Sequence, residues 1–190
     1  MWKYEKKLEF PVNITNKDVR MAKYIVTQFG GPDGELRAAI RYLTQRFTMP
    51  LEEGKALLTE IGTEELAHVE IVCTMLYQLM KNATVQELEE AGLGSHYAEH
   101  KKGLFPTDSN GYVITAYGIG IKGDPIVDIT ENLAAEEKAR ATYEALMDLT
   151  DNPEILAPLA FLREREIVHF QRFGELLMKL KALEKGENIA

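Results

Sequence analysis

Two stretches of this 190-residue chain repeat apolar residues at alternating steps of three and four, and each stretch places a glutamate and a histidine on its apolar stripe. The first stripe consists of Leu58, Ile61, Glu65, His68, Val72, Met75 and Leu79. The second consists of Ile155, Leu159, Leu162, Glu166, His169, Phe173, Leu176 and Leu180. This period is typical of helices that turn one face toward the core of a bundle. Because buried charges need compensation, we expect both Glu and His pairs to share buried metal cations.

Proline, glycine and capping residues divide the chain into helices and connections. They predict long helices over residues 34–47, 50–81, 125–149 and 153–185, and a short helix over residues 85–91. Residues 92–124 are rich in glycine and are predicted to form a long connection. Two helical hairpins joined by one long crossover define a ferritin-like bundle. We therefore expect an all-α, ferritin-like four-helix bundle that forms a single domain over residues 1–190.

Composition narrows the possible partners. The formal net charge of −8 and the lack of a basic patch exclude a nucleic-acid surface. No run of 18 apolar residues and no signal-peptide core appear, so we expect a cytoplasmic protein without a membrane partner. Residues 1–16 contain evenly spaced Trp2, Tyr4, Leu8 and Phe10, which predict an extended arm docked on the bundle or on a neighbouring subunit. A homo-oligomer is therefore expected.

Two further carboxylates follow from the bundle topology. In such bundles a glutamate from each of two helices joins a Glu-x-x-His pair from each of the other two. On the third long helix Glu136 lies on the apolar stripe, whereas Glu137 is expected to face solvent. On the first, Glu35 is the one carboxylate between residues 34 and 47. Alone it would be a first-turn acid favoured by the helix dipole, but the ligand count favours a metal ligand.

Four stretches carry a resemblance to a known family. They are GGPDGEL at residues 30–36, GTEELAH at 62–68, AAEEKARATY at 134–143 and FLREREIVH at 161–169. Together they resemble the manganese catalases, and most closely the short spore-coat members of that family. The resemblance covers nearly the whole chain.

The resemblance implies a specific ligand set. It implies that Glu35, Glu65 and His68 bind one manganese and that Glu65, Glu136 and His169 bind the other, with Glu65 bridging the two ions. Glu166 is then a catalytic acid or base beside the metals, and Tyr42 matches a tyrosine that lies beside the ligands. Larger members carry an arginine just before the third-helix carboxylate, where this chain has Ala135.

The expected reaction is the disproportionation of hydrogen peroxide by two manganese ions. It needs no outside electron donor, and the single cysteine, Cys73, cannot build the cysteine-ligated iron centre of a rubrerythrin-type peroxidase. Oxygen and imidazole ligands suit manganese and iron alike, so a di-iron oxidase or peroxidase remains an alternative. A weakly active structural spore-coat protein, bound to other coat proteins, is a further alternative.

Overall fold

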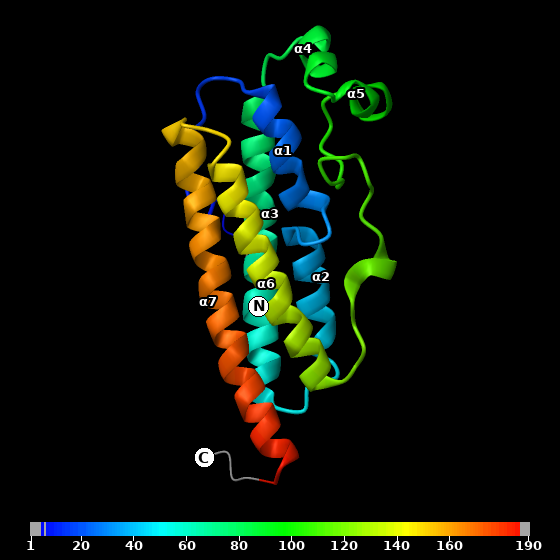
Figure 1. The fold of residues 1–190 in the computed structure, drawn as a ribbon, viewed down its shortest axis with the longest axis vertical. Helices are drawn as coiled ribbons and strands as arrows, with labels where there is room; N and C mark the ends of the chain where they lie inside the picture. Colours follow the sequence, from blue (N-terminus) through cyan, green and yellow to red (C-terminus); the bar gives the residue numbers. More distant parts are fainter. Residues whose placement is uncertain (1–4, 6, 187–190) are drawn as a thin grey trace.

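The computed structural model describes residues 5 and 7–186 and is built from helices (Figure 1). In chain order these are α1 (Val19–Gly30), α2 (Glu35–Gln45), α3 (Glu52–Met80), α4 (Val85–Glu90), α5 (Gly94–His100), the 3₁₀ helix η1 (Ala116–Ile119), α6 (Pro125–Met147) and α7 (Pro153–Glu184). The described residues contain no strand, only an isolated bridge between Thr107 and Val113. None of the described helices is long and apolar enough to cross a membrane.

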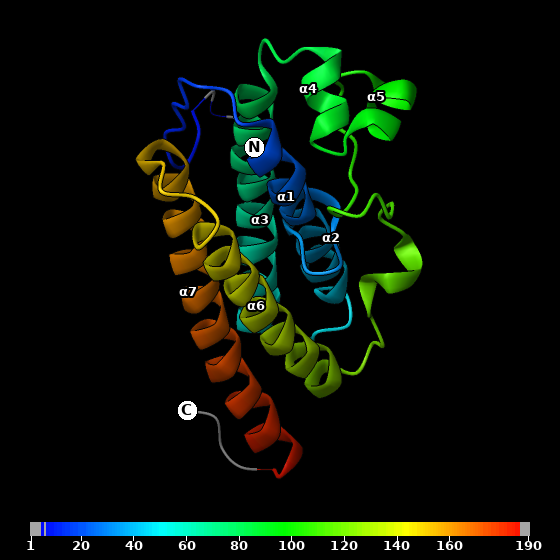
Figure 2. The ribbon, with the colours of Figure 1, turned by 45° about the horizontal axis from the view of Figure 1, so that its top comes forward.

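Two helical hairpins form the bundle. α2 packs on α3 and α6 packs on α7, and the chain from α4 to η1 crosses from the end of α3 to the start of α6 along the outside of α2 (Figures 1 and 2). The predicted caps are present: Thr84 and Glu87 form a capping box, Asp124 caps α6 and Asn152 caps α7. The prediction of an all-α four-helix bundle with a long crossover is confirmed.

Two shorter helices, α1 and α2, together take the place of the first long helix of the bundle. The sequence prediction missed α1. Asp18 caps α1 by accepting a hydrogen bond from the Met21 amide. The helix is interrupted between Gly30 and Glu35, and this turn requires glycine at position 31 because a Cβ on Gly31 would lie 2.3 Å from the carbonyl oxygen of Thr27. The break gives α2 an N-terminus of its own inside the bundle, and Glu35 is its first residue.

The connection over residues 92–124 is also more structured than predicted, since it contains α5 and η1. Both helices are short enough to lack a detectable apolar period. Two arginines of α2 hold the connection at η1: Arg37 donates a hydrogen bond to the Gly118 carbonyl at 2.9 Å, and Arg41 donates one to the Ile119 carbonyl at 2.7 Å.

The N-terminal arm lies against the bundle where the structure describes it. Phe10 stacks on Phe161 of α7 with ring centroids 4.8 Å apart, and the Gln78 side chain pairs with the backbone of Val12 and Ile14. Trp2 and Tyr4, which belong to the predicted arm, lie outside the described residues.

A polar layer crosses the middle of the bundle. One apolar cluster contains buried side chains between Ile71 and Met80 of α3 together with buried side chains from the first part of α7. A second cluster contains Leu58 and Ile61 of α3 together with buried side chains from the last part of α7. Between these clusters α3 contributes Glu65 and His68, both with 0% of their surface exposed. Six buried charged or titratable side chains from four helices thus share one layer: Glu35, Glu65, His68, Glu136, Glu166 and His169. This layer is the candidate site.

Candidate metal centre

The structure brings together all seven residues predicted for the site. Glu35 and Tyr42 come from α2, Glu65 and His68 from α3, Glu136 from α6, and Glu166 and His169 from α7. Each of them is at most 3% exposed. On α3 and α7 the i, i+3 spacing places the carboxylate and the imidazole on the same face, as expected for a helix.

Glu65 lies between the two imidazoles. Its Oε2 is 3.0 Å from Nδ1 of His68, and its Oε1 is 2.9 Å from Nδ1 of His169. A single carboxylate therefore presents one oxygen to each of two rings, whose centroids are 5.7 Å apart. This is the geometry expected of a carboxylate that bridges two ions.

Each imidazole faces a second carboxylate on the same side. Nδ1 of His68 is 3.5 Å from Oε2 of Glu35, and Nδ1 of His169 is 3.6 Å from Oε2 of Glu136. The described residues contain three groups whose ligand atoms lie within 4.8 Å of one another, and two of them lie in the buried layer: Glu65, Glu136 and His169 in one, and Glu35, Glu65, His68 and Glu166 in the other. The third, more exposed group consists of Glu9, Glu64 and His68. Glu166 is close enough to be a ligand or a neighbour, so distance alone does not separate these roles.

The residues fit a pair of metal ions. His169 Nδ1 and Glu65 Oε1 are close, yet neither atom has a hydrogen-bond partner, so their approach lacks hydrogen-bond alignment. Glu136 Oε2 and Glu166 Oε1 are also buried without partners. Unsatisfied buried polar atoms are costly, and here they converge as carboxylate oxygens and imidazole nitrogens, which are the donor types that manganese takes.

The charges of the layer are strongly perturbed. Burial and the nearby Glu65 carboxylate raise the pKa of Glu35 to about 8. Burial raises the pKa of Glu166 well above its ordinary value, and the carboxylates of Glu35, Glu136 and Glu65 raise it further. Burial disfavours the charge of Glu65, but attraction to His169 and hydrogen bonds with His169, His68 and Glu35 together outweigh burial and lower the pKa of Glu65. Carboxylates held this close need cations, and otherwise they retain protons.

The surrounding carboxylates raise the pKa of both histidines and so favour their charged form. Burial acts against the charged form of each ring, but the surrounding carboxylates dominate. The pKa of His169 rises to about 12, chiefly through Glu65, and the pKa of His68 also rises well above its ordinary value. The layer therefore favours cations strongly, whether they are protons or metals.

Two tyrosines hold the outer carboxylates. The Tyr42 hydroxyl donates a hydrogen bond to Oε1 of Glu136, and the Tyr143 hydroxyl donates one to Oε1 of Glu35. In each carboxylate this leaves Oε2 to face an imidazole. Tyr42 was predicted from the resemblance. Tyr143 ends the stretch at residues 134–143 that carries the resemblance, but no sequence signal linked it to a partner 108 positions away.

Glu64 is a second residue that the sequence did not single out. Its Oε2 lies 3.3 Å from Nε2 of His169, and its Oε1 lies 3.7 Å from Nε2 of His68. Arg165 of α7 anchors it through Nε at 2.5 Å. Burial raises its pKa, but the two rings and Arg165 together bring the pKa well below the ordinary range. An ionised carboxylate thus faces the outer nitrogen of both imidazoles.

Glu137, the weaker candidate on α6, lies outside the site. It forms an ion pair with Arg140 at 2.8 Å, and its side chain is 43% exposed. This is the solvent-facing position that the sequence predicted.

A narrow cavity reaches the layer between α2 and α6. Its volume for the centre of a water-sized molecule is about 10 Å³, and it is lined by Pro32, Asp33, Gly34, Glu35, Ala38, Arg41, Tyr42, Ala135, Glu136, Ala139 and Glu166. That is about the room that one water needs. A larger cavity of about 300 Å³ lies between α1, the end of α3 and the crossover, but no residue of the polar layer lines it. We therefore regard the narrow cavity as the entrance to the site.

Comparison with known proteins agrees with this geometry. The model of the manganese containing catalase family matches residues 1–189. Protein CotJC of Bacillus subtilis (strain 168) is 54% identical over 181 residues, covering 95% of each chain. A probable manganese catalase of Clostridium acetobutylicum is 35% identical over 185 residues, covering 95% of this chain and 81% of the relative. The crystal structure of wild-type KatB, a manganese catalase from Anabaena, superposes with a TM-score of 0.84 at 33% identity, covering 95% of this chain and 81% of KatB.

Proposed function

The chain belongs to the manganese catalase family, and we propose that five of its buried side chains hold the two manganese ions. These are Glu35, Glu65, His68, Glu136 and His169. The protein is a manganese-dependent, non-haem catalase with a ferritin-like fold, and its substrate is hydrogen peroxide. The observation that carries the ligand proposal is the position of Glu65, whose two oxygens each approach a different imidazole.

The manganese pair supplies the electron exchange, in which one peroxide is reduced to water and a second is oxidised to oxygen. The net reaction converts two molecules of hydrogen peroxide into two of water and one of oxygen, so it consumes no external reductant. The protons of the oxidised peroxide end in the water that is formed. The residues of the chain must therefore bind peroxide, move protons and keep bulk water out.

Glu166 is the residue best placed to move protons. Its Oε1 has no hydrogen-bond partner, it lines the narrow cavity, and its raised pKa favours a carboxyl group that can hold a proton at neutral pH. A general acid or base is most effective when its pKa lies near the working pH. In our proposal Glu166 accepts a proton from an arriving peroxide and returns it to an oxygen atom that leaves as water.

The surrounding residues fix the ligands. Tyr42 and Tyr143 each occupy one oxygen of a carboxylate and thereby direct the other oxygen into the centre. Glu64 faces Nε2 of both imidazoles, which favours the tautomer with a proton on that nitrogen and leaves Nδ1 free to bind metal. Apolar clusters above and below the layer exclude water.

Metal analysis of single variants tests the ligand proposal. Protein expressed with manganese should hold two ions per chain, and His169→Ala should lose the ion on its side and most of the activity. His100→Ala in α5, a histidine outside the polar layer, is the matched control and should retain both ions. If His100→Ala lost as much metal as His169→Ala, the centre would not be where we propose it.

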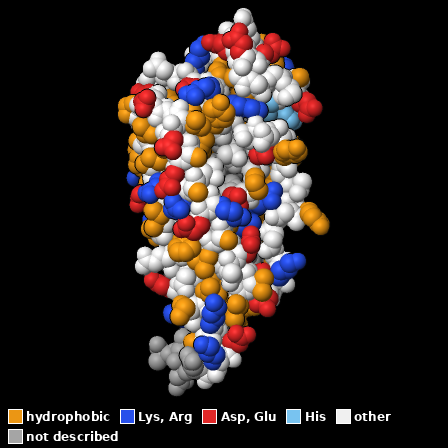
Figure 3. All heavy atoms as spheres, viewed as in Figure 1, with side chains coloured by type: hydrophobic (Ala, Val, Ile, Leu, Met, Phe, Trp, Pro, Cys, Tyr) orange, Lys and Arg blue, Asp and Glu red, His pale blue; other side chains and the backbone are white. Residues whose placement is uncertain are grey.

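We also propose that the chain forms a homo-oligomer and works in the cytoplasm or in a spore coat with other coat proteins. Exposed aromatic side chains support the oligomer, among them Phe47 at 78%, Tyr112 at 76% and Tyr117 at 101% exposure. Charged side chains of both signs are interspersed over the face in Figure 3. Light scattering on the purified protein tests the oligomer, and immunodetection in spore and vegetative fractions tests the location.

A further inference from the structure

Arg41 is a buried arginine beside the metal centre that forms no ion pair among the described residues. It is 3% exposed, and its Nε donates to the Ile119 carbonyl at 2.7 Å. A buried guanidinium is normally matched by a carboxylate or a bound anion, because removing a charge from water is costly. Its terminal N–H groups are therefore available to another acceptor.

The narrow cavity offers a place for that acceptor. Arg41 lines it together with Glu35, Glu136 and Glu166, and it is the one cationic side chain among the lining residues. Asp33, also at the lining, is already paired with Lys138 at 2.8 Å. The hydroxyl of Tyr42 donates to Glu136. Arg41 is thus the cavity's side-chain donor with hydrogen atoms to spare.

The donor groups of Arg41 and the acceptor oxygens of the lining carboxylates are complementary to hydrogen peroxide. A hydrogen peroxide molecule carries lone pairs that accept hydrogen bonds and two O–H groups that donate them. The cavity's volume of about 10 Å³ for the centre of a water-sized molecule is about the room of one water, which favours solutes close to water in size, and hydrogen peroxide is larger than water by one oxygen atom. When peroxide gives up a proton, negative charge develops on its oxygen, and a fixed cation stabilises that charge in a site from which water is excluded.

We propose that Arg41 is a substrate-binding residue of this catalase, holding hydrogen peroxide and its deprotonated form in the cavity through its terminal N–H groups. This inference rests on the proposed function. The bound peroxide lies between the guanidinium, which donates, and the carboxyl group of Glu166, which accepts the proton. Small anions such as azide should occupy the same place, because a cation beside a metal pair attracts them.

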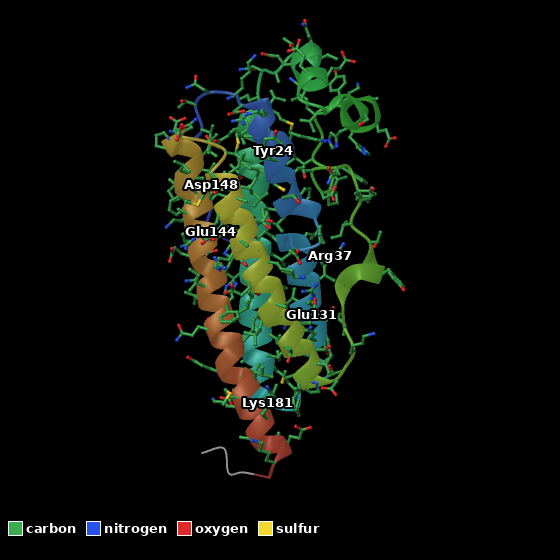
Figure 4. All side chains as sticks on the ribbon, in the orientation of Figure 1. Tyr24, Arg37, Glu131, Glu144, Asp148 and Lys181 are labelled. Atoms are coloured by element: carbon green, nitrogen blue, oxygen red, sulfur yellow. The ribbon has the colours of Figure 1, made fainter. Side chains whose placement is uncertain are left out.

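Arg37 provides a matched control. It lies one helical turn before Arg41 on α2 and holds the same crossover, donating to the Gly118 carbonyl at 2.9 Å. Figure 4 shows Arg37 between α2 and the crossover. Arg37 does not line the narrow cavity. A loss shared by both variants would reflect the anchoring of the crossover, and a loss specific to Arg41 would reflect contact with substrate.

The experiment compares manganese-loaded wild type with Arg41→Gln, Arg41→Lys and Arg37→Gln. Loss of a hydrogen bond from a charged donor predicts that kcat/KM of Arg41→Gln falls by about 10-fold to 100-fold. Arg41→Lys should fall less because it keeps the charge, and Arg37→Gln should stay near wild type. Azide affinity, measured by titration calorimetry, should weaken in Arg41→Gln by a similar factor while manganese content stays unchanged.

Equal kcat/KM and equal azide affinity in the two Gln variants would overturn the inference. If Arg41→Gln fails to fold, Arg41→Met replaces it, and kcat/KM and azide affinity equal to those of Arg37→Gln would overturn the inference instead. Failure of the proposed function is distinguished by the wild type alone: protein that binds two manganese ions and evolves no oxygen refutes the catalase proposal, whereas the azide titrations still report on Arg41.

Discussion

Replacing Glu64 with glutamine should weaken manganese binding although Glu64 is not one of the proposed ligands. Its Oε2 lies 3.3 Å from Nε2 of His169 and its Oε1 lies 3.7 Å from Nε2 of His68, so its charge faces both rings, whereas Glu9, with Oε2 at 3.6 Å from Nε2 of His68, faces that ring. An amide can accept from only one of the two rings and turns its own N–H groups toward the other. Loss of such an outer partner typically costs about 10-fold to 100-fold in metal affinity, or about 1.4–2.8 kcal/mol.

Glu60→Gln is the control for this prediction. Glu60 lies one turn earlier on α3 and also pairs with an arginine of α7, Arg172, at 2.8 Å, but its side chain is 62% exposed against 14% for Glu64. Its loss should leave metal affinity unchanged and alter stability by less than about 1 kcal/mol. The assay is competition with a chelator of known manganese affinity. Equal dissociation constants for the two variants would refute the proposed role of Glu64.

Three further outcomes are expected. Glu166→Gln should keep two manganese ions while turnover falls about 100-fold, which is the scale of a positioned acid or base. Glu65→Gln should instead lose metal. Loss of metal from Glu166→Gln would show that Glu166 is a ligand. Chelation of the metal should lower the thermal midpoint, because manganese at 100 times its Kd stabilises the folded state by about 2.7 kcal/mol; an unchanged midpoint would place the metal outside the fold. Hydrogen bonds from Lys17 and Thr84 lower the pKa of Glu87 from 4.5 to about 2, so its stabilisation is complete above pH 4.5 and is lost as the pH falls toward 2. Glu87→Gln should therefore lower the thermal midpoint at pH 7, and its difference from wild type should shrink in scans below pH 4.5; a constant difference would contradict the assignment.

Much of the site could be predicted from the sequence because its helices are long and regular. The spacing of apolar residues predicted that Glu65 and His68 lie on the core face of α3. The same spacing on α6 predicted that Glu136 is buried and that Glu137 faces solvent. Glu64 was missed because its neighbour Glu65 occupies the apolar stripe, and only the packing of α7 against α3 shows that Glu64 faces both rings.

The missing parts depend on contacts between distant segments. Tyr143 meets Glu35 across 108 positions, and no local pattern encodes that pairing. Helix α1 was missed because Gly30, Gly31 and Pro32 were interpreted only as the start of the next helix, although α1 has 12 residues and a capping Asp18. Arg41 looked like an ordinary helical arginine, and its role in the cavity depends on where the crossover returns to α2.

Oxygen yield from hydrogen peroxide, measured on manganese-loaded protein of known metal content without any reductant, tests the central claim most directly. A chain with two manganese ions should release one molecule of oxygen for every two of peroxide consumed, through many turnovers. Peroxide consumption that requires an added reductant, or that follows iron content instead of manganese content, would contradict it.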